Sequence, residues 1–169
     1  LPLNNLIVFL VSLITGFIPA NKGKVLLKGK NIIGLKPYSI AHKGMARTFQ
    51  IVKPFRKLTV LENVSLAAFL RHSARKDAEA QARRVLERVE LSDKAEAYAS
   101  DLTLSEQKRL EIARALATDP KVLLLDEPMG GLNPTEIDHA SVLVRDICKS
   151  GVTIVWVEHV LKAIMSSCH

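Results

Sequence analysis

No charged side chain occurs before Lys22, although charge is plentiful in the rest of this 169-residue chain. The stretch 6–18 is almost entirely apolar, but no basic segment precedes it and no clear small-residue cleavage site follows, which argues against a secretory signal peptide. Asn5 and Pro19 bound the run, so it is shorter than the roughly 20 apolar residues that cross a bilayer. We expect it to form a buried strand or helix of a globular core.

Cysteine is scarce as well. Cys148 and Cys168 stand far apart, in no metal-ligand or redox spacing, so we expect reduced thiols in a cytosolic protein. A content of 48% hydrophobic and 24% charged residues excludes collagen-like and disordered chains. The net charge of +7 is spread along the chain without a dense Lys/Arg run. It is compatible with an anionic membrane face or with nucleic acid and favours neither.

The middle of the chain has the pattern of amphipathic helices. Thr59 and Glu62 have the spacing of a capping box, and apolar or small residues at 61, 64, 65 and 68 share the face of the helix that follows. Between residues 76 and 91 a second helical repeat places Ala78, Ala82 and Val85 on one side and charged residues on the other. We expect the charged faces to be solvated, with a partner-binding face as the alternative.

The second half alternates between helix and strand patterns. Residues 105–118 have helical periodicity, and residues 121–125 form a short apolar run typical of a strand buried on both faces. Asn133 and Pro134 are typical of a helix start, and the helix should end at Gly151. Residues 152–157 then predict a second buried strand. A strand, a crossover helix and a strand indicate parallel pairing and a three-layer α/β architecture.

Two adjacent carboxylates, Asp126 and Glu127, follow the apolar strand over residues 121–125. Ligands of open α/β folds bind at the carboxyl edge of the sheet, where these side chains should lie. An aspartate there is suited to holding Mg²⁺, and a neighbouring glutamate to orienting and deprotonating a water. Alone, the pair is equally compatible with an exposed strand end.

The order of further motifs reduces this ambiguity. Residues 101–107 (DLTLSEQ) lead into the helix KRLEIARAL, residues 131–136 (GLNPTE) follow the strand, and the next strand ends in Glu158 and His159. From about Leu13 onwards the chain therefore resembles the ATPase subunits of ATP-binding cassette (ABC) transporters, and most closely those of branched-chain amino acid uptake. The resemblance implies an α/β, P-loop NTPase-like three-layer core, N-terminally incomplete, in one partial domain over residues 1–169 that contains a helical subdomain at 53–105.

The resemblance also implies roles for single residues. Gln50, in the segment ARTFQ, corresponds to the glutamine that senses Mg²⁺ and the γ-phosphate and links to the membrane subunit. Asp126 corresponds to the Mg²⁺ ligand, Glu127 to the catalytic base, and His159 to the histidine that contacts the γ-phosphate. Without the resemblance, Gln50 reads as a surface amide and His159 as a structural side chain.

Nucleotide contacts from an opposing subunit are implied for three further residues. Counting back from the helix aligns residues 102–106 (LTLSE) with the family's signature LSGGQ, so Thr103 supplies the hydroxyl and Ser105 replaces a glycine. A helix N-terminus there favours an anion. Thr103 and Glu106 also have the spacing of a simple capping box, and both interpretations can hold together. Asn133 stands where many cassette ATPases have aspartate in the loop between subunits.

The phosphate-binding loop of this family is missing. Such a loop needs glycines for a backbone cradle, a lysine for the β- and γ-phosphates and a hydroxyl for Mg²⁺. Anchoring on LITG at residues 13–16 places Leu1 and Leu6 at the two glycines, Ile7 at the lysine and Val8 at the hydroxyl. We expect weak ATP binding by this chain alone, with residues 1 to about 10 arising from a truncation, a shifted reading frame or a degraded gene.

The resemblance implies the ATP-binding and ATP-hydrolysing subunit, or a fragment of it, of an importer for branched-chain amino acids. Its cofactors would be ATP and Mg²⁺, and its partners a membrane permease and a second ATPase subunit at the cytoplasmic face of the membrane, with no nucleic acid. One alternative is an interaction subunit, or degraded gene product, that keeps the permease-docking surface without binding nucleotide. A cassette protein acting on DNA or ribosomes is a third hypothesis, for which the chain lacks a coiled-coil insertion, a second cassette or a basic linker.

Overall fold

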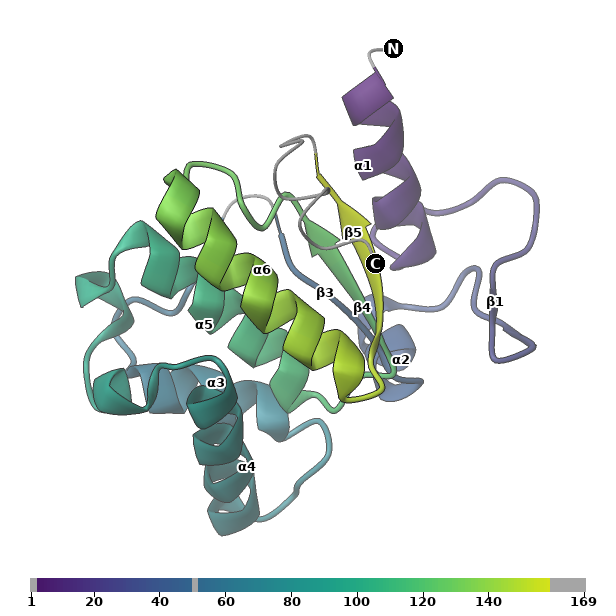
Figure 1. Ribbon diagram of the computed structural model, residues 1–169. Helices are drawn as coiled ribbons and strands as arrows, with labels where there is room; N and C mark the ends of the chain where they lie inside the picture. Colours follow the sequence, from purple (N-terminus) through teal and green to yellow (C-terminus); the bar gives the residue numbers. More distant parts are fainter. Residues whose placement is uncertain (1–2, 50–51, 159–169) are drawn as a thin grey trace.

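The computed structural model describes residues 3–49 and 52–158 and has an α/β fold (Figure 1). Two short 3₁₀ turns lie at Ser92–Lys94 and Ala99–Asp101. The helices and strands, in chain order, are α1 (Leu3–Ile14), β1 (Leu26–Leu27), β2 (Lys30–Asn31), α2 (Pro37–His42), β3 (Met45–Arg47), α3 (Val60–Ala68), α4 (Arg75–Arg88), α5 (Leu104–Ala117), β4 (Val122–Asp126), α6 (Pro134–Lys149) and β5 (Thr153–Val157).

A three-stranded parallel sheet in the order β3-β4-β5 forms the centre. Met45 pairs with Val122, and Val122 in turn pairs with Thr153, so the carboxyl ends of all three strands meet at one edge. The first two strands of the chain make a separate antiparallel hairpin. The parallel pairing predicted from the strand–helix–strand pattern is confirmed for β4 and β5.

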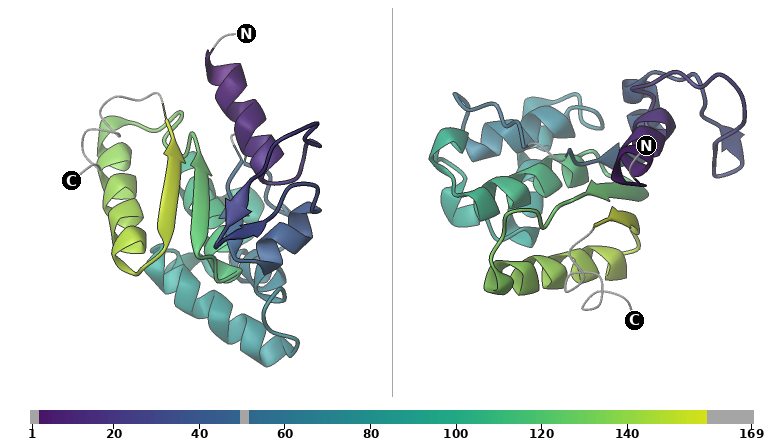
Figure 2. Two further views of the ribbon diagram at one scale, coloured as in Figure 1. Left: turned by 90° about the vertical axis from the view of Figure 1, so that its right-hand side faces the viewer. Right: turned by 90° about the horizontal axis from the view of Figure 1, so that it is seen from above.

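Helices cover both faces of this sheet (Figure 2). Side chains alternate along a strand, so Leu123 and Leu125 point to the face covered by α5 and α6, where both are fully buried. Leu124 points to the opposite face and packs with Val11 of α1 and Ile40 of α2. The predicted three-layer arrangement is therefore present, and Asp126 lies on the α1 side with Leu124.

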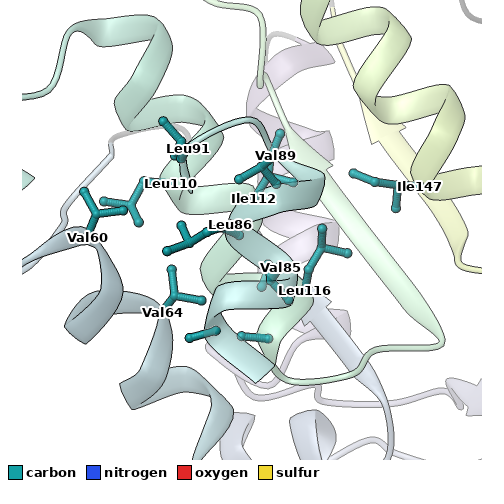
Figure 3. Packing of buried hydrophobic residues seen from close by; sticks show 14 of the residues in the cluster. Val60, Val64, Val85, Leu86, Val89, Leu91, Leu110, Ile112, Leu116 and Ile147 are labelled. Atoms are coloured by element: carbon teal, nitrogen blue, oxygen red, sulfur yellow. The ribbon is translucent and has the colours of Figure 1, made fainter. Parts of the chain in front are cut away.

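The larger hydrophobic cluster joins α3, α4, α5 and α6 to the sheet (Figure 3). The predicted helical faces are confirmed, because the residues that recur at helical spacing in α3, α4 and α5 are buried. Val64, Val85, Leu86 and Leu110 are each 2% exposed or less. Burying a side chain of this size stabilises the fold by about 1.5–3 kcal/mol, so this cluster anchors the helices to the sheet.

Two sequence expectations about burial are wrong in part. The apolar stretch 6–18 forms a helix over most of its length, but Phe9 and Leu10 are 46% and 45% exposed, because α1 contacts the core mainly through Val11. Strand β5 is not buried on both faces, since Val155 is 45% exposed. Among the described strands β5 has a neighbour on one side only.

Strand β4 is the central strand, with β3 on one side and β5 on the other. Within the described residues the two edge strands of this sheet are β3 and β5. No helix in the described part of the chain combines the length and apolar character needed to cross a membrane.

Candidate nucleotide site at the carboxyl edge of the sheet

Asp126 ends β4 and is 2% exposed. Its backbone N–H donates to Thr48 Oγ1 at 3.1 Å, and the Thr48 N–H donates to the Leu124 carbonyl at 2.9 Å, which extends the pairing of β3 and β4 by one residue. One carboxylate oxygen, Oδ2, accepts a hydrogen bond from Arg47 Nη2 at 2.9 Å. The other, Oδ1, has no hydrogen-bond partner among the described residues.

Several neighbouring side chains contact the guanidinium of Arg47. Its Nη1 donates to Ser12 Oγ at 3.3 Å and to Thr15 Oγ1 at 3.2 Å, both at the end of α1. The guanidinium also lies over the rings of Phe17 and Phe49, which meet edge to face. Burial lowers the pKa of Arg47 from its ordinary value, and the nearby charge of Asp126 opposes that shift. The guanidinium thus supplies the counter-charge for a buried carboxylate.

A cavity of about 470 Å³ opens beside this ion pair. Its wall includes Val8 of α1, which stands where the resembling family has the Mg²⁺-binding hydroxyl. Charged side chains make up most of the rest of the lining, which consists of Arg47, Phe49, Lys53, Glu111, Arg114 and Asp126. The cavity is therefore lined on one side by Asp126, the acidic residue expected of the family, but has an apolar side chain where that family has a hydroxyl.

Glu127 follows Asp126 in a left-handed backbone conformation, with φ of +47°. This conformation is unfavourable for a residue with a Cβ, and hydrogen bonds on both sides hold it in place. The Glu127 N–H donates to the Val157 carbonyl at 2.9 Å, and Lys108 Nζ donates to the Glu127 carbonyl at 3.2 Å. The turn after β4 is thereby fixed to both β5 and α5.

The N-terminus of α5 carries the predicted capping box. Thr103 Oγ1 accepts from the Glu106 N–H at 3.3 Å, and the Thr103 N–H donates to Glu106 Oε2 at 2.8 Å. That second bond is the main reason why the pKa of Glu106 is lowered. Thr103 is exposed and Ser105 is partly exposed, so both side chains are accessible from outside the chain. The two interpretations of Thr103, a helix cap and a ligand contact, are therefore geometrically compatible.

The N-terminus of α6 has a second capping box, formed by Asn133 and Glu136. Asn133 Oδ1 accepts from the N–H groups of Thr135 and Glu136, each at 3.0 Å. The loop before it packs on the start of α5: a Cβ built on Gly131 would meet Leu104 Cδ2 at 3.0 Å. The structure thus brings the Thr103 and Asn133 segments together.

Gln50 and His159 lie outside the described residues, so their predicted roles remain predictions. Sequence reasoning gave no role to Arg47, Lys108 or Glu111, although each contacts the candidate site. The sequence feature that could have identified Arg47 is its position three residues before Gln50, at the end of a strand. That strand was itself not predicted, because its three residues carry no periodicity of their own.

The residues present provide a ligand for the Mg²⁺ that the resemblance implies, but they do not provide the groups that would bind the phosphates of ATP. A buried carboxylate oxygen without a hydrogen-bond partner, Asp126 Oδ1, is a suitable hard ligand for Mg²⁺. No group of three or more acidic, histidine or cysteine side chains that could hold a metal occurs in the described residues. Ile7 and Val8 offer neither charge nor hydrogen bonds to phosphate. The described residues alone therefore do not complete a triphosphate site, and we derive no hydrolytic step from them.

Comparison with known proteins places this geometry in a family. The ABC transporter family model matches residues 9–130. The chain is 37% identical to BraF, a high-affinity branched-chain amino acid transport ATP-binding protein of Pseudomonas aeruginosa, over 90% of this chain and 66% of that protein. It is 36% identical to LivG of Escherichia coli K12, a protein with the same description, with the same two shares covered. The chain thus spans just under two thirds of the length of these curated relatives.

Solved structures agree. A nucleotide-free ATP-binding cassette from an ABC transporter superposes with a TM-score of 0.84 at 28% identity, covering 95% of this chain and 68% of that one. An ATP-binding cassette of an ABC transporter in its ADP conformation gives a TM-score of 0.83 at 29% identity, with the same coverage. From its motifs, its fold and these relatives, the chain belongs to the ABC transporter family, as a homologue of the ATP-binding subunits of branched-chain amino acid importers.

Proposed function

We propose that this chain serves as an ATP-binding subunit of an ABC importer for branched-chain amino acids or closely related solutes. The observation that carries the proposal is the placement of Asp126 and Glu127 at the carboxyl end of the central strand, next to Arg47 and the loop that precedes Gln50. The homology to BraF and LivG supports the solute class.

Residue roles follow the same proposal. Asp126, together with Gln50, would hold Mg²⁺, and Glu127 would orient water at the turn that Lys108 and Val157 fix. Thr103, Ser105 and Asn133 would face the nucleotide of a second subunit from the two neighbouring helix N-termini. His159 would complete the site from the segment after β5. ATP supplies phosphoryl-transfer chemistry when it is bound.

The partners in this proposal are a membrane permease and a second copy or homologue of the chain, at the cytoplasmic face of the membrane. The helical subdomain over residues 53–105 would contact the permease. Its helices α3 and α4 share one hydrophobic cluster with α5, so movement of the subdomain would be transmitted to the helix that carries Thr103.

A second candidate function is an interaction subunit that docks on a permease without binding nucleotide. One observation favours it: Val8 lines the cavity beside Asp126, and Arg47 already neutralises that carboxylate. Both features would lower the affinity for MgATP, since an apolar side chain contributes no metal ligand and a guanidinium bound to one carboxylate oxygen competes with Mg²⁺ for the charge of the same carboxylate.

Titration with a fluorescent ATP analogue in the presence of Mg²⁺ separates the two candidates. Saturable micromolar binding that is lost in Asp126→Asn and kept in the exposed control Asp93→Asn supports a nucleotide-binding subunit. An absence of binding by the folded chain supports the interaction subunit. The transport role itself is tested by disrupting the gene, which should reduce cellular uptake of labelled leucine, isoleucine or valine.

A further inference from the structure

Three charged side chains on α5 form a strip that faces the candidate site. Lys108, Glu111 and Arg114 are spaced by three residues and therefore lie along one side of the helix. Lys108 is 7% exposed and Glu111 is 9% exposed. Charged side chains are seldom so deeply buried without specific partners, so each of these needs an explanation.

The partner of each strip residue is a backbone group in a loop. Lys108 Nζ donates to the Glu127 carbonyl at 3.2 Å, in the turn after β4. Glu111 Oε1 accepts from the Phe49 N–H at 2.6 Å, in the segment after β3. Arg114 Nη1 donates to the Lys53 carbonyl at 3.1 Å, further along the same segment.

The strip is also electrostatically coupled along its length. Desolvation raises the pKa of Glu111, while the Phe49 N–H and the positive charges of Lys108, Arg114 and Arg47 act in the opposite direction. A charge removed at one position of the strip therefore changes the environment of the next. The charges alternate along the helix as positive, negative and positive, so Lys108 and Arg114 each lie near the opposite charge of Glu111.

The described residues that the strip holds, Phe49, Lys53 and Glu127, lie outside the helices and strands. Glu127 is in a left-handed conformation, and Phe49 follows a strand of only three residues. Backbone groups in such segments need partners when they are buried, and here α5 provides them. The same helix begins at Thr103, so it touches three of the segments assigned to the candidate site.

We propose that Lys108, Glu111 and Arg114 are positioning residues that hold Phe49, Lys53 and the Glu127 turn in a fixed relation to each other and to the N-terminus of α5. They act through other groups and need not touch a ligand themselves. This proposal rests on the proposed function, which gives these segments their importance. The positioning itself is a property of the chain without nucleotide and can be measured separately.

Amide hydrogen exchange of the full chain, measured residue by residue by NMR without nucleotide, tests this proposal. Glu111→Leu removes the acceptor for the Phe49 N–H and should speed exchange at Phe49 about tenfold or more. Glu111→Gln keeps a carbonyl acceptor and should restore most of the protection. Glu87→Leu, a matched change on the exposed face of α4, should leave Phe49 unaffected.

The decisive measurement is whether a substitution of Lys108 changes the exchange rate of the Phe49 N–H. Lys108→Met should speed exchange at Phe49 severalfold, although the hydrogen bond of Lys108 goes to the Glu127 turn. Lys108→Arg and the exposed control Lys76→Met should not. Unchanged exchange at Phe49 in Lys108→Met, in a variant whose global unfolding free energy matches the Lys108→Arg variant, would overturn the proposal and leave three independent local contacts. Failure of ATP binding would not affect this result, so the two proposals fail separately.

Discussion

The ion pair between Arg47 and Asp126 allows a quantitative prediction. The two side chains are 8% and 2% exposed and their charged atoms are 2.9 Å apart. Replacing Arg47 with methionine leaves Asp126 buried without its counter-charge and also removes two hydrogen bonds to the end of α1. Breaking a buried pair in this way costs about 3–5 kcal/mol, a large part of the about 5–15 kcal/mol that stabilises a typical domain.

Replacing both members of the pair distinguishes an ion pair from simple packing. In the double variant Arg47→Met with Asp126→Leu, both charges are replaced by apolar groups of similar size, so most of the lost stability should return. The double-mutant cycle should therefore give a coupling free energy of about 2 kcal/mol or more. Arg47→Lys, which keeps the charge but not the contacts of the planar guanidinium, should fall between the wild type and Arg47→Met.

Urea unfolding at pH 7, followed by circular dichroism, measures these free energies. A common m-value across the variants would show that the extent of unfolding is unchanged. A loss below about 1 kcal/mol in Arg47→Met, or a double variant no more stable than Arg47→Met, would refute the reasoning that Arg47 is the structural counter-ion of Asp126.

Three further predictions concern pH, capping and the sheet edge. Burial raises the pKa of Glu111, so the folded chain still holds a proton at pH values where the unfolded chain has released it. The free energy of unfolding should therefore fall as pH rises above about 4.5, the ordinary pKa of glutamate. Glu111→Gln should flatten this fall in urea titrations at successive pH values. Thr103→Ala removes the cap of α5 and should lower the unfolding free energy by about 0.5–2 kcal/mol, whereas Thr135→Ala, an exposed position whose side chain does not cap, should change it little in the same assay. Val155→Lys, on an exposed position of the strand at the sheet edge, should reduce light scattering of concentrated samples without lowering the thermal midpoint; unchanged scattering would show that this edge does not drive association.

Helices and the central strand could be predicted from sequence because their signals are local. The apolar periodicity of α4 and α5, the capping boxes at Thr59 and Thr103, the helix start at Asn133 and the apolar run of β4 each depend on neighbouring residues. The position of Asp126 at the carboxyl edge followed directly from them. These are the parts of the fold in which local preference and tertiary structure agree.

The remaining features depend on contacts distant in sequence. Strand β3 has only three residues and is stabilised by pairing with β4, so no local sequence pattern predicted it. The exposed face of α1 and the edge position of β5 follow from which elements pack beside them rather than from their own composition. Arg47 and Glu111 were missed for the same reason, because their partners lie 79 and 62 residues away.

The central claim is that this ABC subunit retains the acidic side of a nucleotide site but has apolar residues where the phosphate cradle belongs. The most direct test grafts that cradle by Leu1→Gly, Leu6→Gly, Ile7→Lys and Val8→Thr and measures binding of a fluorescent ATP analogue with Mg²⁺. We expect the original chain to bind the analogue more weakly than the graft does, and Asp126→Asn to abolish binding by the graft. Micromolar binding by the original chain, equal to that of the graft, would contradict this expectation.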